Sequence, residues 1–167
     1  MENIVYATEA DVFGIKALMD KASEAAERGW YVTDDMEFIR RHIKKEGYTL
    51  KYVIDDKVAA FLIVRSPELS QDNLGYYFEN VCENKLKNIR HMESVVVDAN
   101  YRGRGLHRKL LQKAESIEKT QKTTVLMATV HPDNVYSLRN FEREGYKCLL
   151  ETEKYGGLRR KVMFKTI

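Results

Sequence analysis

The sequence predicts an α/β fold of the α+β kind, with a mixed, mostly antiparallel central sheet of six to seven strands flanked by about four helices. Three observations predict it. Apolar residues recur at helical spacing in several segments, and short polar turns join β-branched runs into hairpins. One succession of strand, glycine-rich turn, helix and strand over 89–130 predicts a right-handed crossover between parallel strands. No linker or repeat interrupts residues 1–167, so we expect a single domain.

The first half of the chain predicts a short strand, two helices and a hairpin. Thr8 and Asp11 have the spacing of a helix N-cap, and Gly29 and Gly47 stand where two helices should end. Apolar residues at helical spacing support the first helix, and a polar turn at 55–57 joins two β-branched runs. The expected elements are strand 4–7, a helix between Thr8 and Gly29, helix 34–45, strand 48–54 and strand 58–64.

The second half predicts a long irregular segment followed by alternating strands and helices. Segment 66–88 contains turn residues and clustered aromatic residues, and loops of this length often form lids or binding loops. Leucines at helical spacing indicate one helix, and Asp133 or Asn134 can cap another that ends at Gly145. The expected elements are strand 89–97, helix 104–119, strand 123–130, helix 133–144 and a closing hairpin of strands 146–155 and 159–165.

Composition and charge predict a cytoplasmic protein that binds neither membranes nor nucleic acids. Hydrophobic residues make up 44% of the chain, yet no apolar run approaches the length of about 20 residues that a membrane helix needs. The N-terminus lacks the pattern of a secretory signal, and Cys82 and Cys148 form no paired motif. The net charge of +3 comes without a basic stripe interleaved with aromatic residues, which argues against nucleic-acid binding.

The most informative stretch is a glycine-rich turn between a β-branched strand and an amphipathic helix. It reads Val-Val-Val-Asp-Ala-Asn-Tyr-Arg-Gly-Arg-Gly-Leu over residues 95–106. Gly103 and Gly105 let the backbone approach a ligand closely, and the free N–H groups of a helix start attract anions. Arg102 and Arg104 add positive charge. The turn therefore predicts an anion site suited to the pyrophosphate of a nucleotide-bearing cofactor.

A second motif, His-Pro-Asp-Asn-Val-Tyr-Ser-Leu-Arg-Asn-Phe-Glu-Arg-Glu-Gly-Tyr, follows about 30 residues later, over 131–146. With both motifs in this order, the chain resembles the GNAT superfamily of acetyl-CoA-dependent N-acetyltransferases. The family fingerprint, Gln/Arg-x-x-Gly-x-Gly/Ala, can be aligned in two registers. From Asn100 both glycines fit but asparagine replaces Gln/Arg, whereas from Arg102 the first glycine fits but His107 occupies the final Gly/Ala position.

The resemblance implies that acetyl-CoA is bound by the glycine turn, the helix of the second motif and a splay between the two central strands. The residues that it assigns to the cofactor are Val95, Val97, Arg102, Gly103, Arg104, Gly105, Leu106, His107, Asn134, Ser137, Asn140 and Phe141. Val95 and Val97 would contribute main-chain groups. Asn134 would cap its helix, contact the cofactor or do both, and His107 would either face the phosphate or point away. No metal is expected.

Acetyl transfer to an amine needs a group that removes a proton and a group that returns one to the leaving thiolate. Glu93 and His91 are the candidate bases, and we favour Glu93; by strand alternation both should point to the same side as Val95 and Val97. Many family members use a tyrosine as the acid, but its position is occupied here by Phe141. Ser137, one turn earlier on the same helix face, is our candidate; Tyr136 and solvent are the alternatives.

The function implied by the resemblance is transfer of an acetyl group to a primary amine, of a small molecule or of a peptide or protein, by direct attack in a ternary complex. The departures at Phe141 and His107 support an alternative, a non-catalytic acyl-CoA-binding or sensing module. Edge strands near the C-terminus would allow a homodimer. We expect the acceptor site among the first two helices, segment 66–88 and the turn at 156–157. Candidate lining residues are Trp30, Tyr31, Tyr76, Tyr77, Phe78 and Tyr155, with Glu27, Asp34, Asp35, Glu79 and Glu83 as candidate anions.

Overall fold

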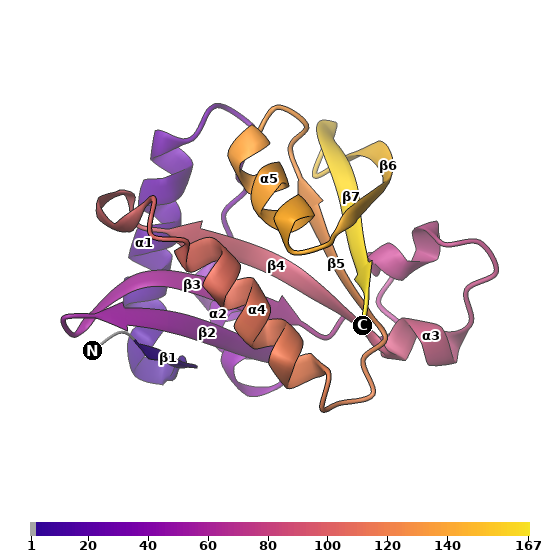
Figure 1. The fold of residues 1–167 in the computed structure, drawn as a ribbon, viewed down its shortest axis with the longest axis horizontal. Coiled ribbons are helices and arrows are strands. Elements are labelled where there is room, and N and C mark those ends of the chain that lie inside the picture. Colours follow the sequence, from indigo (N-terminus) through magenta and orange to yellow (C-terminus); the bar gives the residue numbers. More distant parts are fainter. Residues whose placement is uncertain (1–2) are drawn as a thin grey trace.

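The computed structural model describes residues 3–167 and confirms a mixed, mostly antiparallel sheet with helices on both faces (Figure 1). The strands are β1 (Asn3–Tyr6), β2 (Gly47–Ile54), β3 (Lys57–Arg65), β4 (Ile89–Val97), β5 (Val125–Val130), β6 (Lys147–Lys154) and β7 (Leu158–Thr166). The helices are α1 (Val12–Ala25), α2 (Met36–Lys44), α3 (Glu83–Lys87), α4 (Leu106–Glu118) and α5 (Val135–Arg143). Short 3-10 helices are η1 (Glu9–Asp11), η2 (Leu74–Tyr77) and η3 (Ala99–Tyr101). None of the helices within 3–167 is long and apolar enough to cross a membrane.

The seven strands lie in the order β1-β2-β3-β4-β5-β7-β6, and β4 and β5 form the parallel pair. Their ladder covers only the start of both strands, from Ile89 opposite Val125 to His91 opposite Met127. Beyond that point β4 stays paired with β3, and β5 stays paired with β7. The central strands therefore separate toward their C-terminal ends, which confirms the expected splay (Figure 1).

Strand β4 contains a β-bulge at Glu93, because Ser94 pairs with Ile63 and Met92 pairs with Val64, leaving no partner for Glu93. The extra residue reverses the side-chain alternation. Met92 and Val95 consequently pack into the same hydrophobic cluster although they are three residues apart. The expectation that Glu93 and His91 share one side with Val95 and Val97 was therefore wrong: strict alternation holds only where every residue is paired.

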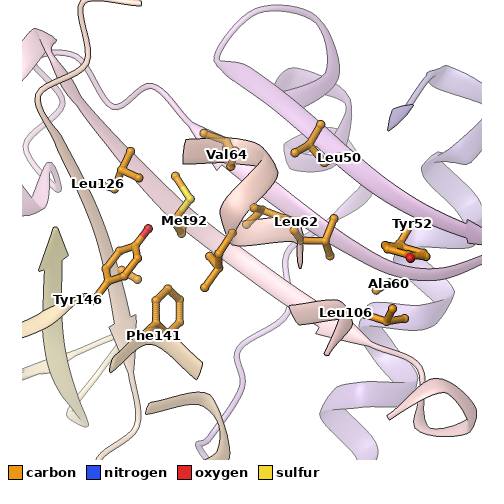
Figure 2. Close-up of a cluster of buried hydrophobic side chains, with 14 of the residues drawn as sticks. Leu50, Tyr52, Ala60, Leu62, Val64, Met92, Leu106, Leu126, Phe141 and Tyr146 are labelled. Carbon is orange, nitrogen blue, oxygen red and sulfur yellow. The ribbon is translucent and has the colours of Figure 1, made fainter. Parts of the chain in front are cut away.

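Two hydrophobic clusters cover the two faces of the sheet. Helices α4 and α5 cover one face, where Leu106 and Phe141 belong to the same cluster as strand residues such as Leu62 (Figure 2). Helices α1 and α2 cover the other, with Ile15, Met19 and Ile39 packed against Phe61 and Ile63. The leucines of α4 recur at helical spacing, so one stripe of that helix is buried.

The structure differs locally from the sequence expectations in three places. Helix α1 ends at Ala25, before Gly29. Helix α4 begins at Leu106, because Gly105 adopts a left-handed conformation with φ of 72° and acts as the N-cap. Segment 66–88 is more ordered than expected: it contains η2 and α3, whose Leu74 and Leu86 form a third cluster with residues of β4, β5 and β7.

Candidate active site

A cavity of about 310 Å³ lies at the point where β4 and β5 separate. Its walls come from both central strands, from the end of β3, from segment 66–88 and from the end of β6. The lining residues are Arg65, Asp72, Leu74, His91, Met92, Glu93, Ala128, Thr129, Glu153, Lys154 and Tyr155. The cavity thus brings together both candidate bases, Glu93 and His91. Of the aromatic residues expected to surround the acceptor, Tyr155 lines it.

Glu93 is a largely buried carboxylate held between two nitrogen-bearing side chains. Its Oε2 lies 3.5 Å from Nδ1 of His91 and 4.0 Å from Nη1 of Arg65. Burial alone would raise the pKa of Glu93, but the hydrogen bond and charge of His91, together with Arg65, lower it below its ordinary value. Glu93 is therefore ionised at neutral pH.

Arg65 is itself fixed by a bidentate ion pair with Asp72. Nη1 and Nη2 of Arg65 lie 2.8 Å and 2.9 Å from the two carboxylate oxygens of Asp72, and Ser70 Oγ donates to Oδ1 of Asp72 at 2.6 Å. A paired guanidinium in this geometry is strongly oriented. Segment 66–88 thus supplies the counter-ion that orients the arginine facing Glu93.

The loop between α1 and α2 and the turn between β6 and β7 form the other sides of this region. Tyr31 is hydrogen-bonded to the Ser94 hydroxyl on β4, and Tyr155 Oη lies 3.1 Å from Thr129 Oγ1 on β5. The backbone of the loop is tied to β7, because Nη2 of Arg160 donates to the carbonyl of Gly29 at 2.8 Å. The segments that we expected to surround the acceptor therefore meet around the splay.

The glycine turn is arranged to receive an anion. Gly103 and Gly105 have φ of 78° and 72°, and a Cβ atom at either would meet nothing within 4 Å. The first intrahelical bond of α4 runs from the Lys109 amide to the Gly105 carbonyl, so the preceding amides lack helical acceptors. Arg102 and Arg104 are exposed on either side of Gly103. This open cradle of free N–H groups fits a diphosphate.

Main-chain groups of β4 line the splay beside this turn. The Asp98 amide donates to the Ala59 carbonyl, so the backbone N–H and C=O groups of Asp98 face β3. Alternate residues of an antiparallel strand direct their N–H and C=O groups to the same neighbour. Val97 and Val95 therefore direct theirs to the opposite side, where the β5 ladder has already ended. An extended ligand arm could pair with them as a strand does.

Helix α5 carries the remaining candidate residues. Asn134 caps it, its Oδ1 accepting the Ser137 amide at 3.1 Å. Phe141 is 3% exposed and makes an edge-to-face contact with His107, with ring centroids 5.3 Å apart. His107 thus turns toward α5, and burial lowers its pKa to about 4, so the ring is neutral near pH 7.

None of the residues assigned to the cofactor lines the Glu93 cavity. Ser137, half-buried on α5, does not line it, and Asn140 makes a main-chain bond to the Glu144 amide at 3.3 Å. Leu106 packs fully into the core, so that its backbone amide is the part available to a ligand. The acid and base candidates therefore lie on different elements, α5 and β4.

A family model described as the acetyltransferase (GNAT) family matches residues 15–146, most of the chain. The chain belongs to the GNAT acetyltransferase family. This confirms the family, the fold class and the acetyltransferase activity class expected from the two motifs. No curated protein gives a significant match to this GNAT sequence.

Solved GNAT structures superpose on nearly the whole chain. The ribosomal-protein-alanine N-acetyltransferase of Brucella melitensis is 23% identical, with a TM-score of 0.74 over 99% of both chains. The putative acetyltransferase yncA of Salmonella typhimurium, solved with its cofactor acetyl-CoA, is 19% identical, with a TM-score of 0.74 over 99% of this chain and 94% of that one. The ribosomal-protein-S18-alanine N-acetyltransferase of Escherichia coli is 16% identical, with a TM-score of 0.73 over 100% of this chain and 94% of that one. Acetyl-CoA as the cofactor is thereby confirmed at the level of the family.

Several residues of this GNAT site were missed in the sequence. Arg65 and Asp72 are seven residues apart, in a strand end and a loop, and no motif links them. Thr129 and Lys154 likewise lack any local pattern. The one available signal was Arg65 itself, a charged residue that directly follows an apolar strand run.

Proposed function

We propose that this GNAT acetyltransferase transfers the acetyl group of acetyl-CoA to a primary amine by direct attack in a ternary complex, with Glu93 as the base. One observation carries the proposal: an ionised, largely buried carboxylate lies in a cavity at the splay of the central strands. The amine would belong to a small molecule or to a peptide or protein. Acetyl-CoA supplies an activated acetyl thioester.

The cofactor would be held by backbone groups rather than by a charged pocket. Amides at the start of α4, with Gly103 and Gly105 before them, would bind the diphosphate. Arg102 and Arg104 would add attraction for its charge. The main-chain groups of Val95 and Val97 would pair with the pantetheine arm along the open side of β4.

Glu93 would remove the proton that the acceptor must lose. An amine with a pKa near about 10 is mostly protonated at neutral pH, and its lone pair is free only after deprotonation. The Glu93 carboxylate is ionised and lies 3.5 Å from His91 Nδ1, so it can accept that proton directly or through one water molecule.

Ser137 would return a proton to the sulfur as the thioester bond breaks. Phe141 occupies the same helix face one turn later but carries no exchangeable proton. The Ser137 amide is bonded to Asn134 Oδ1, which holds the residue in the first turn of α5. Tyr136 is 74% exposed at the start of α5 and faces elsewhere.

The test is acetyl-CoA-dependent release of free thiol across a library of amines and peptides. Glu93→Gln should lower kcat/KM by at least about 10²-fold, the range of general-base catalysis, while calorimetric CoA affinity stays unchanged. Glu24→Gln, an exposed change on α1, is the matched control and should behave as wild type.

A non-catalytic CoA-binding module is the second candidate, and the phenylalanine in the usual acid position favours it. It predicts CoA binding with no thiol release for any acceptor. If Glu93→Gln turned over at the wild-type rate, the protein would be an active acetyltransferase, but Glu93 would not be its base.

A further inference from the structure

His91 bridges two partners from a buried position on β4. Its side chain is 4% exposed. The backbone N–H of Leu74 donates to Nε2 of His91 at an N···N distance of 3.1 Å, and Nδ1 lies 3.5 Å from Glu93 Oε2. One ring nitrogen thus faces a donor and the other faces an acceptor.

These partners determine which nitrogen carries the proton. A backbone amide can only donate, so Nε2 must present its lone pair to Leu74. In the neutral ring the proton therefore resides on Nδ1, where it points at the carboxylate. The lone pair of His91 is already occupied by Leu74, whereas Glu93 keeps acceptor capacity toward the cavity. The geometry therefore favours Glu93 over His91 as the base.

We propose that His91 is a positioning residue: the Leu74 amide fixes its proton on Nδ1, and that N–H orients the Glu93 carboxylate for the acceptor. The inference rests on the proposed function, in which Glu93 is the base. His91 itself takes no proton from the acceptor. It acts only through Glu93.

Segment 66–88 then becomes part of the proton-transfer machinery. The Asn73 side chain, 2% exposed, donates to the carbonyls of Glu68 and Leu86 and accepts the Gly75 amide. This network holds the turn that carries the Leu74 amide. The same segment carries Asp72, the partner of the arginine facing Glu93. Preorganised supports of this kind reduce the reorganisation needed at the reacting carboxylate.

Other ionisable groups also act on Glu93 and set the background for any pH effect. They are Arg65 on β3, Tyr31 and Asp34 in the α1–α2 loop, His42 on α2 and Tyr155 after β6. Asp72 in segment 66–88 acts instead on Arg65 and His91. Glu153 and Lys154 line the β6 wall. A substitution of His91 leaves all of these in place, so a change in the Glu93 titration can be attributed to the lost imidazole, and comparison of His91→Leu with His91→Asn separates its N–H group from its charge.

The first test is the pH profile of kcat/KM, whose acid limb reports the base in the free enzyme. His91→Leu removes the donor and should move the acid limb upward by about one pH unit, the effect of one hydrogen bond to a charged group. His91→Asn retains an N–H donor near the Nδ1 position and should restore the limb. An unmoved limb in His91→Leu would overturn the inference, provided that Glu93→Gln abolishes turnover.

The second test needs no turnover. Nitrogen-15 NMR of the imidazole in the wild-type protein above pH 8 should report a protonated Nδ1 and an unprotonated Nε2. The opposite tautomer would overturn the inference even if Glu93 is the base. If Glu93→Gln stays active while both His91 variants lose activity, the proposed base is wrong as well, so the two failures can be distinguished.

Discussion

Asp34 and Glu93 are acidic residues of one region whose pKa values move in opposite directions. Burial is the largest influence on each. For Asp34, repulsion from Glu93 and Asp35 adds to burial and raises its pKa to about 6. For Glu93, His91 and Arg65 outweigh burial and lower the pKa. Because their pKa values differ in this way, Asp34 can be protonated at a pH at which Glu93 is ionised.

Asp34→Asn should stabilise the protein at pH 7.5 and have little effect near pH 4. The pKa of Asp34 is higher in the folded state than the ordinary 3.8, so the stability it contributes when protonated is lost as pH rises through about 6. Asparagine carries no charge and removes that loss. Thermal denaturation at both pH values measures the difference, with the exposed Asp133→Asn as control. Equal effects of Asp34→Asn at the two pH values would contradict the prediction.

Helices α4 and α5 each carry one half of the proposed cofactor site, and the start of α4 depends on one left-handed residue. Gly105→Ala and Gly156→Ala are matched, because both glycines have positive φ (72° and 79°) and open space around a Cβ atom. Each substitution should cost about 1–2 kcal/mol of unfolding free energy. Only Gly105→Ala should also weaken CoA binding, by about tenfold or more, because the amides at the α4 start would shift.

Urea denaturation and CoA calorimetry on the two alanine variants separate these effects. Gly156 lies in the β6–β7 turn, far along the chain from the glycine turn. If both variants bound CoA as wild type does, the turn before α4 would not be the diphosphate site.

Helix α5 presents Ser137 and Phe141 one turn apart. Ser137→Ala should lower kcat by about 10-fold to 10²-fold, since solvent can replace part of an acid's contribution. Phe141→Tyr in the Ser137→Ala background should recover part of the loss, because it places a hydroxyl on the same helix face. Steady-state kinetics of the single and double variants test this. A kcat for Ser137→Ala equal to wild type would assign protonation to solvent.

The whole molecule is organised around a sheet whose two faces carry separate cores. The α4–α5 face holds the residues that we propose bind the cofactor, and the α1–α2 face carries the loop with Tyr31 and Asp34. The splay between β4 and β5 is where ligands bound from the two sides can meet. In the proposed mechanism, donor and acceptor therefore meet at this strand gap rather than in a pocket within either core.

CoA should therefore protect a restricted part of the sheet against hydrogen exchange. We expect slower exchange at the amides of 95, 97 and 105–108, which lack strand or helix partners, and little change in α1 and α2. At a CoA concentration of about 100 times Kd the fold should gain about 2.7 kcal/mol. Exchange measured with and without CoA tests both statements, and protection confined to α1 and α2 would contradict them.

Most of the fold was predictable because its signals are local. The Asn134 cap, the glycines before α4, the β2–β3 hairpin turn and the apolar stripes each lie within a few consecutive residues. Segment 66–88 was less predictable. Its η2 and α3 are short, and they are stabilised by Leu74 and Leu86 packing against distant strands rather than by their own periodicity.

The sequence by itself determined the acetyltransferase family and predicted the diphosphate turn and Glu93 as a candidate base, because those depend on residue identity over short spacings. Only the tertiary structure decided how Glu93 is surrounded. The bulge at Glu93 exists because β3 and β4 pair out of step, and the Leu74 amide and the Arg65 side chain reach the site from other segments. Pairing register and contacts between distant segments are set by packing of the whole chain, and no short pattern encodes them.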